Sequence, residues 1–141
     1  MPAHTVVRMK NLLGESCKNT SILVLGVSYR QDVGDTRYSP VETLVRGLEA
    51  DGAQVTCFDP FIDYWPEMDR CLPSHLPEVG SFDAVVLAIP HSDFSDLDLL
   101  NWLKGARPVI LDTANVVSKV QRQRCRAAGI RIESVGRGDG L

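Results

Sequence analysis

The residues best suited to chemistry stand together in one loop, "VSYRQDVGDTRYSP" (27–40), directly after an apolar run. Tyr29 and Arg30 place an aromatic ring beside a fixed cation. An arginine with free donors can fork onto a diphosphate, and a tyrosine can pack on a base or ribose. Asp35 and Arg37 are close enough in sequence to pair and brace the loop. Spacing alone also fits a solvated loop that only braces itself, so both interpretations stay open.

A dinucleotide-binding loop is the first alternative. Its fingerprint needs closely spaced glycines, so that a pyrophosphate can lie on the helix N-terminus, but only Gly26 and Gly34 are available. "SPVE" (39–42) predicts a capping box with proline at the first helical position, which would already occupy part of that N-terminus. Asp59 stands where a ribose-binding acid would, although Asp-Pro is also an ordinary turn. We therefore expect this chain itself to bind no cofactor.

Short apolar runs alternate with helical patterns along the chain, and this alternation indicates βαβ units. The fold class predicted is α/β, with a Rossmann-like open parallel sheet of about five strands and helices on both faces. Strands are expected in 21–27, 53–60, 82–90, 108–113 and 130–134, and helices in 3–13, 41–51, 97–103 and 117–128. The segment 60–65 is expected to be irregular. The first helix precedes the sheet as a linking helix.

In such sheets ligands bind in the crevice outside the carboxyl ends of the strands. Asn115 is expected at this crevice, and Asp112 in a structural role. His91 is expected to make a loop hydrogen bond. Trp65 and Trp102 are expected to be packing residues. Four loops should converge on the crevice: 27–39, 59–65, 90–93 and 113–116.

Composition excludes several classes of function. The 141 residues fit one domain, and a net charge of −3 does not favour a polyanion or an anionic membrane as partner. The basic residues of 117–128 predict the solvated face of a helix, with no nucleic-acid motif beside them: Lys119, Arg122, Arg124 and Arg126. The four cysteines form no CxxC pair, so no metal site is predicted. No apolar run could span a bilayer, and we expect a cytoplasmic protein.

Several motifs together carry a resemblance: "LGVSYRQDVGDTRYSP", "GLEADGAQVTCFDPF", "DAVVLAIPHSDF" and "VILDTANVV". They resemble the C-terminal, nucleotide-sugar-binding domain of the UDP-glucose/GDP-mannose dehydrogenase family. "DVGDTR" is most similar to the UDP-sugar members, particularly the UDP-N-acetylhexosamine 6-dehydrogenases. "MPAHTVVRMKNLL" is similar to the end of the helix that joins this domain to the central region of the family. The resemblance implies that 1–20 is the end of the linking helix and that 21–135 is the UDP-binding domain. The remaining residues, 136–141, are expected to form a loose tail.

The resemblance also implies a function. Family members oxidise the C6 hydroxyl of a nucleotide sugar to a carboxylate with NAD, through a thiohemiacetal on cysteine. The NAD domain, the central dimerisation region and the catalytic cysteine lie in parts that this chain does not resemble, so no catalytic residue is expected here. Tyr29 and Arg30 match the aromatic-lysine pair that contacts the nucleotide and its phosphates, and Asn115 is the third expected UDP contact.

Departures from the family pattern keep an alternative open. Arg30 keeps the charge of the usual lysine but not its geometry. Ala114 stands where the family commonly has an arginine that helps to hold the ligand, which weighs against tight UDP binding. Tyr38 replaces a usual glutamate and is expected at the surface. The alternative is a stand-alone Rossmann-like interaction or regulatory domain without catalytic activity; a small NAD-binding redox protein is a third, less favoured one.

Overall fold

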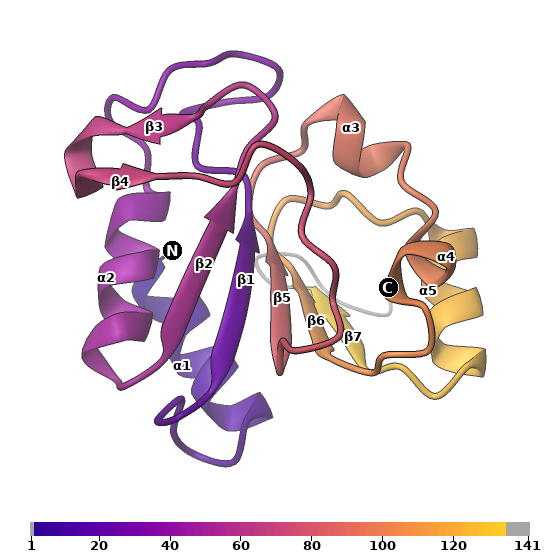
Figure 1. The fold of residues 1–141 in the computed structure, drawn as a ribbon. Coiled ribbons are helices and arrows are strands. Elements are labelled where there is room, and N and C mark those ends of the chain that lie inside the picture. Colours follow the sequence, from indigo (N-terminus) through magenta and orange to yellow (C-terminus); the bar gives the residue numbers. More distant parts are fainter. Residues whose placement is uncertain (1, 135–141) are drawn as a thin grey trace.

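The computed structural model describes residues 2–134, and its centre is a five-stranded parallel sheet (Figure 1). The strand order is β2-β1-β5-β6-β7. Every pair of neighbours in this sheet is parallel, as the apolar runs predicted. The strands are β1 (Ser21–Leu25), β2 (Gln54–Phe58), β5 (Ala84–Leu87), β6 (Val109–Asp112) and β7 (Ile132–Ser134).

Helices cover both faces of the sheet, which confirms the predicted α/β class. One face carries α1 (Pro2–Leu12) and α2 (Val41–Ala50); the other carries α3 (Ser92–Ser95), α4 (Leu99–Leu103) and α5 (Lys119–Ala127) (Figure 1). Strand β1 shows why both faces need a cover. Ile22 and Val24 point into the core under α1 and α2, whereas Leu23 and Leu25 point into the opposite core. All four side chains are fully buried, as expected for a central parallel strand.

The strand order places a topological switch point between β1 and β5. The chain leaves β1 toward one edge of the sheet and leaves β5 toward the other, so the loops after these strands diverge. In doubly wound folds this divergence opens the crevice in which ligands bind. The loop 26–40 after β1 and the loop 88–91 after β5 therefore border the expected crevice.

The segment 60–71 differs from the irregular loop that was expected. It contains a short antiparallel hairpin of β3 (Tyr64–Trp65) and β4 (Arg70–Cys71), joined by the 3-10 turn η1 (Pro66–Met68). Trp65 is fully buried in the core beside α2, which confirms its predicted packing role. Two-residue strands are too short to show a periodicity, which is why the sequence did not predict them.

Two local predictions were wrong. The predicted capping box does not form, because the Glu42 carboxylate accepts from Arg46 instead of reaching back to the Ser39 N–H. The Ser39 N–H donates to the carbonyl of Thr36, and the helix begins at Val41. The Ser39 hydroxyl accepts from the Val41 N–H, at 3.2 Å, and not from the Glu42 N–H that a capping box requires.

The second wrong prediction concerns the basic face of α5. The Arg122 side chain is only 18% exposed, and its Nη2 lies 4.0 Å from the buried carboxylate of Asp112. Lys119, Arg124 and Arg126 are exposed as predicted. The helix expected over 97–103 begins at Leu99, because the Asp98 side chain caps it by accepting the Asn101 N–H.

The expected domain boundaries stay predictions. Helix α1 lies within the expected linking segment 1–20, packs on α2, and is tied to β7 by an ion pair between Arg8 and Glu133. The expected tail, 136–141, lies outside the described residues. Among residues 2–134, no helix is long and apolar enough to cross a membrane.

Candidate functional site

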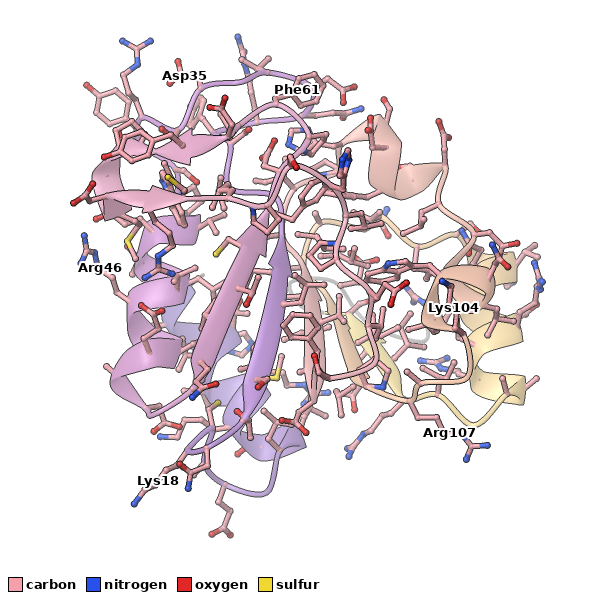
Figure 2. The ribbon with its side chains drawn as sticks, viewed as in Figure 1. Lys18, Asp35, Arg46, Phe61, Lys104 and Arg107 are labelled. Carbon is pink, nitrogen blue, oxygen red and sulfur yellow. The ribbon has the colours of Figure 1, made fainter. Side chains whose placement is uncertain are left out.

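Tyr29 and Arg30 lie in the loop after β1, at the carboxyl end of the sheet. Both side chains are exposed, Tyr29 by 51%. Within residues 2–134 the Arg30 guanidinium makes no hydrogen bond or ion pair, so its donors are free. Asp35 from the same loop and Phe61 from the loop after β2 lie at this end of the molecule (Figure 2). The predicted nucleotide contacts thus stand on the crevice and not in the core.

The start of this loop is held by Asp59, at the end of β2. One carboxylate oxygen, Oδ2, accepts from the N–H groups of Val27 and Ser28 at 2.9 and 3.0 Å, and from the Ser28 hydroxyl at 2.8 Å. The other oxygen accepts from the Phe61 N–H. Burial alone would raise the pKa of Asp59, but hydrogen bonds from His91, Phe61 and the loop outweigh burial and lower it. Asp59 is therefore a buried anion whose acceptors are used by the protein itself.

The far side of the loop is held by the loop after β5. The Asp32 carboxylate accepts from the N–H and the hydroxyl of Ser92, at 2.9 and 2.7 Å. These two hydrogen bonds, the backbone one first, lower the pKa of Asp32. The Asp32 N–H in turn donates to Nδ1 of His91, at 2.8 Å. The two loops at the switch point are thus bound to each other.

Asp35 and Arg37 pair within the loop. The Arg37 Nε and Nη2 donate to the two oxygens of Asp35 at 3.1 and 2.8 Å, in a bidentate fork. Hydrogen bonds from Arg37 lower the pKa of Asp35 to about 2. The Asp35 carbonyl also accepts from the Tyr29 N–H. Of the two arginines in the loop, Arg37 is therefore occupied by a carboxylate and Arg30 is not.

Asn115 stands on a separate loop after β6, with its side chain exposed and a left-handed φ of 57°. The Asp112 carboxylate shapes this loop by accepting three backbone N–H groups, those of Ala114, Val116 and Val117. This confirms a structural role for Asp112. Because β6 is two strands from β1, the ends of the strands that lead to Asn115 and Tyr29 are roughly 10 Å apart across the sheet. Asn115 thus lies at the same end of the sheet as Tyr29 but on a different loop.

Gly26 explains why the loop resembles a cofactor motif at its start. Its φ is +101°, and a Cβ on this residue would lie 2.7 Å from the Cβ of Ile89. Gly26 is thus required by contact between the loops after β1 and β5, not by a phosphate. Gly34 likewise lies against the backbone of Phe61. Together with the fully engaged carboxylate of Asp59, these contacts give no support to dinucleotide binding here.

Other chemistry-bearing groups do not gather at the crevice. Cys17, Cys57 and Cys125 are buried, and burial raises their pKa, to about 11 for Cys17 and about 12 for Cys57. Among residues 2–134, no group of three or more His, Cys, Asp or Glu side chains could hold a metal ion. A cavity of about 380 Å³ lies beside β2 and not at the strand ends. Its lining consists of Val55, Thr56, Cys57, Arg70, Cys71, Leu72 and Pro73.

A match to a family model shows to which protein family the chain belongs. Residues 23–119 match the model of the UDP-glucose/GDP-mannose dehydrogenase family, UDP binding domain. The match covers the sheet from β1 to the start of α5 and includes all the loops described above. The chain belongs to this family. Its fold is that of the UDP-binding domain.

Curated relatives show how much of a dehydrogenase this UDP-binding domain spans. The chain is 28% identical to a UDP-glucose 6-dehydrogenase of Rickettsia bellii, and the alignment covers 96% of the chain but 32% of the relative. It is also 28% identical to a UDP-N-acetyl-D-mannosamine dehydrogenase of Methanocaldococcus jannaschii, covering 98% of the chain and 31% of the relative. The UDP-binding domain described here thus spans about a third of the length of these enzymes.

A solved structure agrees with this assignment. The UDP-binding domain superposes on an NDP-N-acetyl-D-galactosaminuronic acid dehydrogenase from Methanosarcina mazei with a TM-score of 0.81. The two chains are 27% identical over 96% of the present chain and 29% of the other. The likeness therefore extends to α1, which lies outside the range of the family model.

Proposed function

We propose that this chain binds the UDP portion of a nucleotide sugar, with Tyr29, Arg30 and Asn115 as contacts, as part of an NAD-dependent UDP-sugar 6-dehydrogenase. The observation that carries the proposal is the Arg30 guanidinium, which makes no hydrogen bond within residues 2–134, on a loop that is anchored by hydrogen bonds to Asp59, His91 and Ser92. A guanidinium with unused donors can bind a diphosphate bidentately. The exposed Tyr29 ring beside it offers a stacking surface for a base or ribose.

The reaction would require the rest of the enzyme. The three buried thiols have raised pKa values, which makes them poor nucleophiles at neutral pH. The NAD site, the central dimerisation region and the catalytic cysteine are accordingly assigned to the two thirds of the relatives that this chain does not cover. On this proposal the chain alone binds the nucleotide and does not turn it over.

The test is a calorimetric or NMR titration of the chain with UDP. Saturable binding at up to millimolar UDP is expected. Arg30→Ala should weaken it about tenfold, the effect of losing a charge-assisted contact, and Arg37→Ala should weaken it less because Arg37 is already paired. Arg107→Ala is the matched control, an exposed arginine at the opposite end of the molecule from Asp35 (Figure 2).

The absence of saturable binding by the unmodified chain would overturn the proposal. So would equal losses in the Arg30 and Arg107 variants. Either result would favour the interaction or regulatory domain, which the replacement of the usual arginine by Ala114 also suggests.

A further inference from the structure

His91 occupies an unusual position for an imidazole. It is fully buried at the switch point, between the rings of Phe61 and Phe94, whose centroids lie 5.0 and 5.6 Å from its own. Both ring nitrogens have partners. Nδ1 faces the Asp32 N–H at 2.8 Å, and Nε2 faces Oδ2 of Asp59 at 2.9 Å.

These partners fix the tautomer of His91. A backbone N–H can only donate, so Nδ1 must present its lone pair to Asp32. The single proton of the neutral ring is then on Nε2, where it donates to Asp59. The imidazole therefore links Asp59, at the end of β2, to the backbone of Asp32, in the loop after β1.

Hydrogen bonds hold that loop on both sides of the predicted contacts. On the N-terminal side of Tyr29 and Arg30, the Asp59 carboxylate accepts from the N–H groups of Val27 and Ser28. On the C-terminal side of Tyr29 and Arg30, Nδ1 of His91 accepts from the N–H of Asp32. Asp32 has a left-handed φ of 56°, which is uncommon for a non-glycine residue, although aspartate adopts it more often than most. Tyr29 and Arg30 lie between the two anchored points.

We propose that His91, as the neutral Nε2–H tautomer, is a positioning residue that sets the loop carrying Tyr29 and Arg30 for nucleotide binding. The inference rests on the proposed function, because it concerns the same loop. The inference goes further than the proposed function because it assigns the orientation of Tyr29 and Arg30 to His91, a residue that contacts neither of them. On this proposal the effect of His91 on the ligand contacts passes through the Asp32 N–H, from which its Nδ1 accepts.

Two substitutions separate the two hydrogen bonds of His91. In His91→Asn the amide oxygen replaces Nδ1, which keeps an acceptor for Asp32 and removes the donor to Asp59. In His91→Gln the amide nitrogen replaces Nε2, which keeps the donor to Asp59 and removes the acceptor for Asp32. Both variants lose the same ring contacts with Phe61 and Phe94, so each is the matched control of the other.

The readouts are UDP affinity and the hydrogen-exchange rate of the Asp32 amide, measured well below the melting temperature of each variant. His91→Gln should weaken UDP binding about five- to tenfold, the effect of one lost hydrogen bond, and should speed exchange at Asp32. His91→Asn should stay within about twofold of the unmodified chain, since the hydrogen bond to Asp32 is kept. Equal UDP affinities of the two variants would overturn the positioning role.

Two measurements keep the test decisive if a variant does not fold. The nitrogen spectrum of His91 in the unmodified chain should show an unprotonated Nδ1 and a protonated Nε2 at neutral pH; the opposite tautomer would overturn the proposal. Ser92→Ala removes an exposed hydroxyl from the Asp32 carboxylate but keeps the hydrogen bond from the Asp32 N–H to His91. The Asp32 amide should therefore exchange at nearly the rate of the unmodified chain, and a rise as large as that expected for His91→Gln would count against the proposal. If the unmodified chain binds no UDP, the proposed function fails, and exchange at Asp32 alone decides whether His91 sets the loop.

Discussion

Gly26 and Ile89 meet so closely that a side chain on Gly26 would require the strand ends to move. A Cβ there would lie 2.7 Å from Cβ and 2.8 Å from Cγ1 of Ile89, and the φ of +101° disfavours any other residue. This contact joins β1 to β5 at the switch point. It fixes the distance between the loops that border the crevice.

We therefore expect Gly26→Ala to destabilise the chain by about 2 kcal/mol or more, from overpacking and the strained φ together. Urea unfolding measures the change. The control is Gly80→Ala, at an exposed position with no atom within 4 Å of an added Cβ. Similar stabilities of the two variants would mean that the loops can move apart without cost.

Asp59→Asn should lower the free energy of unfolding by about 3 kcal/mol, because an amide cannot accept all the hydrogen bonds that the buried carboxylate accepts. The Asn amide group would face the N–H of Val27, Ser28 or Phe61. Asp63→Asn, at an exposed position, is the control and should be nearly neutral. A loss of similar size in both variants would show that burial of Asp59 is not the cause.

The pH dependence of stability should also reveal Asp59. Its pKa is lowered in the folded chain, so its contribution is fully present above the ordinary pKa of an aspartate and is lost as pH falls through the lower folded value. Unfolding free energies measured from neutral pH down through pH about 4 and below should fall less steeply in Asp59→Asn than in the unmodified chain. Parallel curves would contradict the lowered pKa.

Restoring an arginine at Ala114 should strengthen UDP binding. Ala114 lies beside Asn115 in the loop after β6, half-buried against the core. One added charge-assisted contact predicts a gain of about tenfold in affinity, measured by calorimetry. Ala127→Arg adds the same charge near the far end of α5 and should change nothing. An equal gain in both variants would indicate nonspecific attraction to the phosphates.

The thiols should differ sharply in reactivity. Cys71 is exposed, whereas Cys17, Cys57 and Cys125 are buried and have raised pKa values. Mass spectrometry after brief alkylation of the native chain should therefore show one adduct, on Cys71, and four after denaturation. Modification of a buried thiol at a similar rate would show that the core around it opens easily.

The sequence predicted the sheet well because parallel central strands are continuous apolar runs. The five runs predicted from the sequence correspond to β1, β2, β5, β6 and β7. It predicted the anchoring of the loop poorly, since Asp32, Asp59 and His91 come from three separate segments and no local pattern links them. Asp59 was considered as a ribose acid or a turn residue, but its burial was not foreseen.

One missed residue did leave a signal. Arg122 lies three positions before the buried Cys125, so both are on the same face of α5. That spacing, together with Asp112 at the end of β6, could have indicated a partly buried arginine. The basic composition of α5 indicates a solvated face, whereas its helical period indicates a partly buried Arg122.

The anchoring of the loop after β1 at Asp59 also has an entropic consequence. Val27 and Ser28 lose their backbone freedom when the chain folds, since their N–H groups are bound to a buried carboxylate. This backbone is therefore already ordered before a ligand binds. The affinity of whatever binds there is then set by the few side chains that project from a rigid support, and a single substitution among them can change specificity without refolding the domain.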